Sequence, residues 1–307
     1  MTAPRRHSPD APTVRTRDAI TRASARLDAA GVASPRVDAE ILAASVLGVA
    51  RGRLAVDAAF TAEQLRDFDR LVARRTAREP LQHLTGTAGF RHLDLRVGTG
   101  VFVPRPETEL LAGWGIAAAR AAGTAPIVVD LCSGSGAIAL SVAQEAPGAR
   151  VWAVERSPGA LRWLRRNATD RAAAGDPLIA VVAADVTAPR LLDELVDAVD
   201  VLLCNPPYVP DGTPVPPEVL DHDPTGTVGG GPAGRASVRP VVARATALLR
   251  PGAVIGIEHD ETQADAVRAV FAHAARFEAV ELHRDLAGRP RYTTARKSAH
   301  TGPWQTG

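Results

Sequence analysis

The spacing of hydrophobic residues over positions 15–82 is typical of α-helices. In the stretch RDAITRASARLDAAG, the apolar residues Ile20, Ala23 and Leu27 share one helical face, and Gly31 ends the pattern. We therefore predict that the first part of the 307-residue chain begins with an amphipathic helix.

Two further helices have clear start signals. Ser34 followed by Pro35 predicts an N-cap and a first helical position, and Gly48 would end that helix. Thr61 and Gln64 form the pattern of a capping box at the start of the next helix. We expect a small helical bundle with no titratable cluster of its own, serving either as a stabilising cap or as a substrate-recognition module.

Beyond the bundle the hydrophobic period changes. The stretch FRHLDLRVGTGVFVP alternates apolar and polar residues around a Gly-Thr-Gly sequence, which predicts a β-hairpin near residues 90–103. A helix is predicted next, with Pro106 near its start and with Glu107 and Glu109 in its first turn, where the helix dipole favours acids.

The remaining chain alternates apolar strands with helices, which predicts a parallel, doubly wound sheet and an α/β fold. The strands are expected at residues 126–132, 150–155, 178–185, 199–204 and 253–258. The last part, FEAVELHRDLAGRPRYTTAR, holds two strands joined by a short turn, so they must form an antiparallel hairpin at the edge of the sheet.

The first strand-to-helix turn of this sheet predicts a cofactor site. Asp130 precedes the turn, and Gly134 and Gly136 lie in it, where glycines permit a sharp turn and close approach of a ligand to the backbone. Glu155 ends the next strand, where a ribose diol would find a carboxylate, and Asp185 ends the third strand in an equivalent position. A nucleoside-bearing cofactor is expected, and the turn alone does not tell which one.

The sequence CNPPYVP, which follows the strand VDVLL, indicates the chemistry. In such sheets ligands lie outside the carboxyl ends of the strands where the strand order reverses, which should place Asn205 beside the glycine turn. The Asn205 side-chain oxygen and the Pro206 carbonyl can each accept one N–H of a planar amide or amino nitrogen, aiming its lone pair at an electrophilic methyl group. Pro207 stiffens the segment, and Tyr208 offers a flat face to the substrate. This arrangement suits methyl transfer to nitrogen without a general base.

Composition and charge indicate the expected partners and cellular location of the protein. The net charge is +2 and Lys297 is the sole lysine, with arginines and acids interspersed. We therefore expect a solvated mixed surface and no direct recognition of nucleic-acid sequence. Two cysteines, Cys132 and Cys204, cannot form a disulfide framework, and they are expected to be reduced. With neither a secretory signal nor an apolar run of about 20 residues, we expect a cytoplasmic, monomeric protein without a membrane partner.

The chain resembles the HemK family of protein-(glutamine-N5) methyltransferases, which modify peptide chain release factors with S-adenosylmethionine. The similarity is collinear and covers nearly the whole chain. The segments that carry it are EPLQHLTG (79–86), FVPRPETELL (102–111), DLCSGSGAIAL (130–140), NPPYVP (205–210) and GRPRYTTAR (288–296). The NPPY motif alone would also admit DNA adenine methyltransferases, whereas VPRPETE with an N-terminal helical domain is far more specific.

The resemblance implies a role for each site residue. The turn that would wrap the methionyl part of the cofactor consists of Cys132, Ser133, Gly134, Ser135 and Gly136. Glu155 would hold the ribose hydroxyls, and Asp185 and Val186 would lie against the adenine. The segment Asn205, Pro206, Pro207 and Tyr208 would bind the substrate glutamine, with Asn205 also beside the cofactor and with Asn205, Pro206 and Tyr208 as the catalytic group.

For some other positions the resemblance does not assign a definite ligand role. Arg105 and Glu107 would lie on a segment covering the pocket, either as ligand contacts or as an exposed helix start. Cys132 stands where a smaller or hydroxylated residue is more usual, and residues 221–234 depart from the more apolar family loop, so they receive no ligand role. No metal site is expected.

The domain organisation follows from these patterns. We predict a disordered leader (1–14), a helical substrate-recognition domain (15–86), a β-hairpin linker (87–104), a methyltransferase domain with a seven-stranded sheet (105–297) and a flexible tail (298–307).

The predicted activity is methyl transfer to the side-chain nitrogen of the glutamine in the Gly-Gly-Gln motif of release factors. A ribosomal-protein glutamine methyltransferase or a DNA adenine methyltransferase would use the same motif. Outside this class, a nicotinamide-dependent oxidoreductase would fit the glycine turn but leave NPPY without a role. A non-catalytic adaptor would bind a release factor through the helical domain alone.

Overall fold

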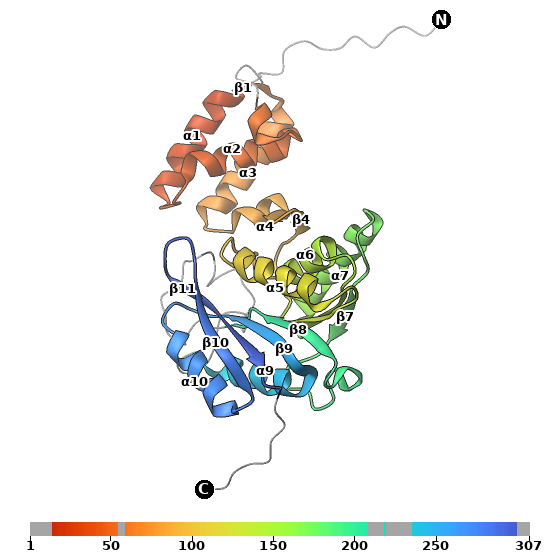
Figure 1. Ribbon diagram of the computed structural model, residues 1–307. Helices are drawn as coiled ribbons and strands as arrows, with labels where there is room; N and C mark the ends of the chain where they lie inside the picture. The colour runs from red at the N-terminus through yellow and green to blue at the C-terminus, as the bar shows by residue number, and fades with distance from the viewer. Residues whose placement is uncertain (1–13, 55–58, 208–217, 219–234, 300–307) are drawn as a thin grey trace, which may run out of the picture. The chain divides into compact units, whose positions relative to one another are not determined.

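The computed structural model describes residues 14–54, 59–207, 218 and 235–299 (Figure 1). Residues 1–13 and 300–307 of the expected leader and tail therefore lie outside the described residues, as do Tyr208 and the loop 221–234. Two expected boundaries need correction. Val14, assigned to the leader, pairs with Phe60, and Ser298, assigned to the tail, donates its backbone N–H to the Arg276 carbonyl at 2.9 Å. Contacts divide the chain into two compact units, residues 1–86 with 216–222, and residues 87–215 with 223–307.

The first unit is helical, as its hydrophobic pattern predicts. It contains α1 (Thr16–Ala29), α2 (Pro35–Leu47), α3 (Ala62–Thr76) and α4 (Leu81–Thr85), with a short 3-10 turn (Arg51–Arg53) and the paired strands β1 (Val14–Arg15) and β2 (Ala59–Phe60). The fully buried side chains at its centre include Leu27, Leu42, Phe60, Phe68 and Val72. The rings of Phe60 and Phe68 stack with their centroids 5.1 Å apart.

The starts of two helices differ in how they are capped. At α3 the capping box is complete, because Thr61 Oγ1 accepts the Gln64 N–H at 3.2 Å and Gln64 Oε1 accepts the Thr61 N–H at 3.0 Å. At α2 the side chain of Ser34 makes no capping hydrogen bond, although Gly48 ends that helix in the left-handed conformation.

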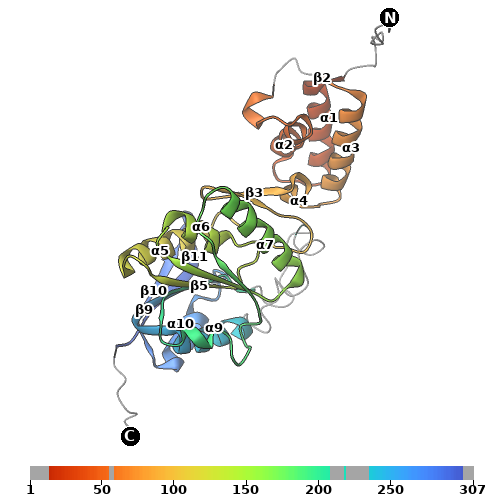
Figure 2. The same ribbon diagram turned by 90° about the vertical axis from the view of Figure 1, so that its right-hand side faces the viewer.

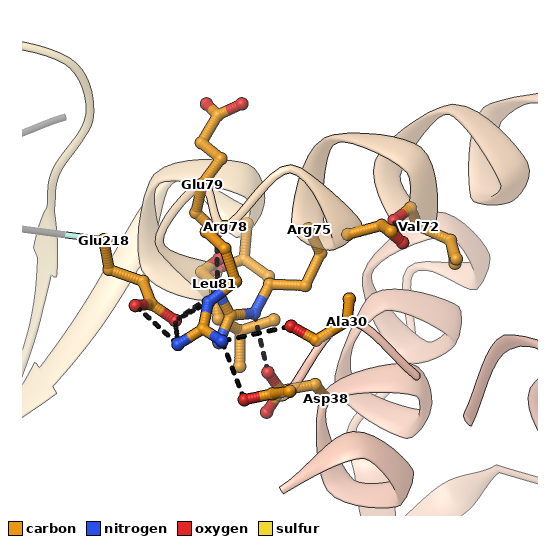
Figure 3. A network of polar contacts seen from close by, with 11 residues as sticks. Ala30, Asp38, Val72, Arg75, Arg78, Glu79, Leu81 and Glu218 are labelled. Carbon is orange, nitrogen blue, oxygen red and sulfur yellow. Dashed lines mark hydrogen bonds and ion pairs between the residues drawn. The ribbon is translucent and has the colours of Figure 1, made fainter. Parts of the chain in front are cut away.

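The helical unit holds a charged cluster that the sequence did not predict (Figure 3). Arg75 on α3 donates to Asp38 on α2 at 2.8 Å, and both side chains are only 9% exposed. Arg75 also donates to Glu218 at 3.0 Å, and Arg78 binds both Glu218 oxygens at 2.8 and 2.9 Å. We call Asp38, Arg75, Arg78 and Glu218 the charged cluster. The expectation of a bundle with no titratable cluster of its own was wrong, because the cluster forms only when Glu218, far away in sequence, meets Arg75 and Arg78.

Ionisation of Glu218 is favoured inside this cluster. Burial by itself would raise its pKa, but hydrogen bonds from Arg78 and Arg75 outweigh burial and hold the pKa at about 2. The Glu218 carboxylate is therefore charged at neutral pH, and its charge is shared by two guanidinium groups.

The second unit is built on the predicted parallel sheet. The strands β5 (Ile127–Leu131), β6 (Arg150–Glu155), β7 (Ala180–Ala183), β8 (Val199–Cys204) and β9 (Leu249–Glu258) run parallel. The terminal strands β10 (Phe277–Arg284) and β11 (Pro290–Lys297) form the expected antiparallel hairpin. The strand order β10-β11-β9-β8-β5-β6-β7 confirms the doubly wound, seven-stranded fold.

Helices cover both faces of this sheet. The helices α5 (Thr108–Ala122), α6 (Ala137–Glu145) and α7 (Pro158–Ala173) lie on one face, and α9 (Arg235–Leu248) and α10 (Ala264–Ala274) on the other (Figures 1 and 2). Alternate residues of each strand pack against the helices on opposite faces of the sheet. On β5, Val128 packs with α5 and α6, whereas Val129 packs with the layer that contains α9. A strand buried on both faces must be apolar throughout, which explains the continuous hydrophobic runs.

The predicted β-hairpin is present but its position needs correction. It consists of β3 (Thr87–Phe90) and β4 (Leu93–Arg96), with its turn at Arg91 and His92 and not at the Gly-Thr-Gly sequence. Phe90, Leu93 and Leu95 are buried in the same core cluster as α5 and α6. The hairpin is thus part of the second unit.

Within the residues that the structure describes, no helix combines the length and the apolar character needed to span a membrane.

Candidate active site

The site lies where the sheet reverses its strand order. β5 is flanked by β6 on one side and by β8 on the other, and Leu131 at the end of β5 pairs in parallel register with Cys204 at the end of β8. The turn that begins at Cys132 and the segment that begins at Asn205 therefore leave the sheet side by side at its carboxyl edge. This is the position at which doubly wound sheets bind ligands.

The turn after β5 has a left-handed backbone at three positions. Cys132, Gly134 and Gly136 have φ angles of +60°, +57° and +89°. At Gly136 a Cβ atom would lie 2.6 Å from Leu164 Cδ1, so only glycine fits there, whereas nothing lies within 4 Å of a Cβ at Gly134. The turn is thus packed on one side against α7 and open on the side of Gly134, as close approach of a ligand requires.

Side chains hold this turn in place from two directions. Ser133 Oγ donates to the Asp130 carbonyl at 2.8 Å, and Asn167 on α7 donates to the Ser135 carbonyl at 2.9 Å. Asn167 is only 2% exposed. Hydrogen bonds within the protein therefore fix the conformation of the turn.

Glu155 is fixed beside the turn by three backbone N–H groups. Its Oε2 accepts from Gly134 at 2.9 Å, and its Oε1 accepts from Arg156 at 2.8 Å and from Ser157 at 2.7 Å. A carboxylate has about four lone-pair sites, so Oε2 keeps the capacity to accept one more hydrogen bond. That remaining capacity fits the predicted contact with a ribose hydroxyl.

Asp185 lies beyond the end of β7, which stops at Ala183, two residues earlier than the predicted strand. Its Oδ1 accepts from the Thr187 hydroxyl at 2.7 Å and from the Thr187 N–H at 2.8 Å, and Arg156 donates to Oδ2 at 2.9 Å. These hydrogen bonds, those from Thr187 first, lower the pKa of Asp185 to about 2. Val186 is half-buried and packs against the core on the α9 side.

Asp130, the acid in front of the turn, is almost completely buried at 1% exposure. Its Oδ2 accepts the Ala139 N–H at 3.2 Å, and its Oδ1 accepts no hydrogen bond from the described residues. Burial raises the pKa of Asp130 to about 7, because the charged form loses its solvation. An acid poised near neutrality thus lies directly under the turn.

Asn205 is held by a residue that the sequence interpretation did not single out. Its Nδ2 donates to Thr108 Oγ1 at 3.2 Å, and Thr108, the first residue of α5, is 4% exposed. Pro206 is buried and Pro207 half-buried, while the predicted partner Tyr208 lies outside the described residues. Only the VPRPETE motif, which contains Thr108, could have drawn attention to this threonine.

The segment ahead of α5 shows no direct link to the turn. The Arg105 guanidinium lies over the Phe102 ring, 4.9 Å from its centroid, and Glu107 precedes α5 without a capping hydrogen bond. Ligand roles for Arg105 and Glu107 stay predictions. Cys132 follows the end of β5, Cys204 ends the neighbouring strand β8, and both are free thiols.

A doubly wound seven-stranded sheet with a glycine turn after β5 and Asn-Pro-Pro at the end of the adjacent strand β8 defines a class I S-adenosylmethionine-dependent methyltransferase. Residues 18–86 match the family described as PrmC N-terminal domain, and residues 117–216 match the methyltransferase small domain. The release factor glutamine methyltransferase of Mycolicibacterium smegmatis is 50% identical over 94% of this chain and 99% of its own. That of Streptomyces coelicolor is 46% identical over 91% of this chain and 97% of its own. The chain belongs to the release factor glutamine methyltransferase family.

Proposed function

We infer that this protein transfers a methyl group from S-adenosylmethionine to the side-chain amide nitrogen of a glutamine in a peptide chain release factor. The observation that carries this inference is the Asn205 carboxamide, oriented at the strand end next to the glycine turn. The named relatives, similar over almost their whole length, support the release factor as substrate.

The cofactor supplies an electrophilic methyl group, and the residues beside β5 suit such a molecule. The open side of Gly134 leaves room at the backbone, Glu155 Oε2 can accept from a ribose hydroxyl, and Val186 offers apolar surface to an adenine. Asp130 Oδ1 is a buried acceptor without a partner among the described residues, which suits a cationic ligand above the turn. We assign cofactor contacts to Cys132 through Gly136, Glu155, Asp185, Val186 and Asn205.

Asn205 and Pro206 activate the substrate by position. An amide nitrogen is a poor nucleophile because its lone pair is delocalised. When the Asn205 oxygen and the Pro206 carbonyl each accept one N–H of the glutamine, the nitrogen lone pair points towards the methyl donor. The same acceptors stabilise the positive charge that develops on nitrogen. As the bond from nitrogen to the methyl carbon forms, the bond from sulfur to that carbon breaks and leaves S-adenosylhomocysteine, and the methylated nitrogen then loses one proton to solvent. We assign Pro207 to holding these acceptors rigid and Tyr208 to stacking on the planar amide.

The proposal also covers the target glutamine, the role of the helical unit and the cellular location. We propose that the glutamine is that of the Gly-Gly-Gln tripeptide, that the helical unit recognises the release factor, and that the protein works as a cytoplasmic monomer without nucleic-acid or membrane partners. The mixed distribution of arginines and acids supports the absence of a DNA-tracking groove.

The test is incubation with labelled S-adenosylmethionine and, separately, with purified release factor, ribosomal proteins and DNA. Label on the release-factor glutamine, located by mass spectrometry of peptides, is the expected result. Label only on a ribosomal protein or on DNA adenine would replace the proposed substrate. Failure to bind S-adenosylmethionine in calorimetry would favour an adaptor, and a nicotinamide absorbance change would favour an oxidoreductase.

A further inference from the structure

The Asn205 carboxamide has two ends that are alike in shape and opposite in hydrogen bonding. Its oxygen accepts and its nitrogen donates. Only the oxygen can receive an N–H from a substrate amide, and a rotated side chain would face that N–H with a second donor. Rotation about one bond therefore separates a productive from an unproductive site.

In the structure, Thr108 contacts the nitrogen end of this carboxamide. Its Oγ1 accepts from Asn205 Nδ2 at 3.2 Å, which ties the nitrogen end to α5 and leaves Oδ1 on the opposite end of the amide. Both residues belong to the second unit, and the hydrogen bond joins positions 97 residues apart in sequence.

Thr108 is well placed to hold that orientation because α5 is packed tightly on β8. A Cβ atom at Gly115 would collide with the side chain of Leu203, so glycine at this position lets the helix approach the strand that ends one residue before Asn205. Leu111 and Ala112, one turn beyond Thr108, are fully buried. The hydroxyl is thus presented from a rigid element.

We propose that Thr108 is a positioning residue that sets the orientation of the Asn205 carboxamide, so that Oδ1 faces the nitrogen to be methylated. This inference rests on the proposed function. In this proposal Thr108 acts on the reaction through Asn205 alone.

Three substitutions separate the hydroxyl from the shape of the side chain. Thr108→Val keeps the shape and removes the hydroxyl, Thr108→Ala removes hydroxyl and methyl, and Thr108→Ser keeps the hydroxyl. Thr246→Val is the matched control, because Thr246 on α9 bonds a carbonyl of its own helix. Steady-state methyl transfer to purified release factor and calorimetric binding of S-adenosylmethionine are measured for each variant.

Thr108→Val and Thr108→Ala should lower kcat roughly three- to tenfold, the range that corresponds to one hydrogen bond. Cofactor affinity should stay unchanged, and Thr108→Ser should recover most of the turnover. In an Asn205→Ala background Thr108→Val should have no further effect, since the group that it orients is missing. A purely structural role would instead lower thermal stability and turnover in both backgrounds.

The inference is overturned if folded Thr108→Val or Thr108→Ala turns over like wild type, or if the loss is equally large without Asn205. Failure of the proposed function is distinguishable, because wild type itself would then not label the release factor. Should Thr108→Val not fold, the comparison of Thr108→Ala with Thr108→Ser decides.

Discussion

The amide of Asn205 should contribute to turnover more than to cofactor binding, because it faces the substrate nitrogen in the proposed mechanism. Asn205→Ala is expected to lower kcat about 10²- to 10³-fold, the effect of removing one preorganised partner from a transition state. Asn205→Asp, which retains an acceptor of similar shape, should keep more activity than the alanine variant. Single-turnover assays with release factor at saturating S-adenosylmethionine measure this effect, and normal turnover in Asn205→Ala would refute the mechanism.

Glu155 should show the opposite pattern. Its carboxylate accepts three backbone N–H groups, one of them from Gly134 in the cofactor turn. Glu155→Ala leaves these donors without their partner and loosens the turn, so S-adenosylmethionine affinity should fall about 10- to 100-fold. Turnover at saturating cofactor should largely recover. Calorimetry gives the affinity, and an unchanged Kd would show that the carboxylate only shapes its own loop.

Asp130 should make the free energy of unfolding decrease as pH rises towards neutrality. Its pKa is raised from 3.8 to about 7 on folding, so the folded state binds the proton more tightly. Its stabilising contribution is complete at low pH and is lost as pH rises from about 4 to 7, by at most roughly 1.4 kcal/mol per pH unit. Asp130→Asn removes this pH dependence, because the amide does not titrate. Urea unfolding across that window should show the variant gaining stability relative to wild type as pH rises, and a constant difference would contradict the prediction.

Two helices of the first unit, α3 and α2, differ in whether the N-cap side chain forms a capping hydrogen bond. Thr61 completes a capping box on α3, whereas the Ser34 side chain at α2 makes no capping hydrogen bond. Thr61→Ala should therefore lower the free energy of unfolding by about 1 kcal/mol, and Ser34→Ala by much less. Thermal unfolding of both variants measures the difference. Equal losses would mean that the hydroxyl at position 34 is bonded in solution.

Elements whose signals are local could be predicted from the sequence. The strands β6 and β8 begin and end as predicted, and α2 ends at Gly48, since buried apolar runs and terminal glycines act within a few residues. The hairpin turn was misplaced because Gly-Thr-Gly is the stronger turn signal, whereas Arg91 adopts a φ of +52° in the actual turn. Within the site, the edge position of Asn205 followed from sheet topology. Its bond to Thr108 did not, because it depends on how α5 packs against β8.

Glu218 connects the helical unit to a distant part of the chain. The side chains of its arginine partners Arg75 and Arg78 are 9% and 25% exposed. Glu218→Gln would leave Arg78 without its carboxylate and Arg75 with Asp38 alone. The expected loss of stability is about 2 kcal/mol at pH 7, less than for a fully buried pair because Glu218 remains 17% exposed. Asp69→Asn is the control in the same unit, since its ion pair with Arg26 is exposed and should contribute little.

The pH dependence of this effect has a definite sign. Folding lowers the pKa of Glu218 from 4.5 to about 2, so its contribution is present above about pH 4.5 and is lost as pH falls towards 2. The difference in unfolding free energy between wild type and Glu218→Gln should shrink over that range. A difference that is independent of pH would mean that the loss comes from packing and not from charge.

For chimeric enzymes, the charged cluster changes where two related genes can be joined. A crossover at residue 86 would transfer Asp38, Arg75 and Arg78 from one parent and take position 218 from the other. If that parent carries no acid at 218, the hybrid inherits two guanidinium groups without their shared carboxylate. Recombination that exchanges the helical unit should therefore move position 218 together with residues 1–86. The contacts of the helical unit, and not a continuous stretch of sequence, decide which residues must come from the same parent.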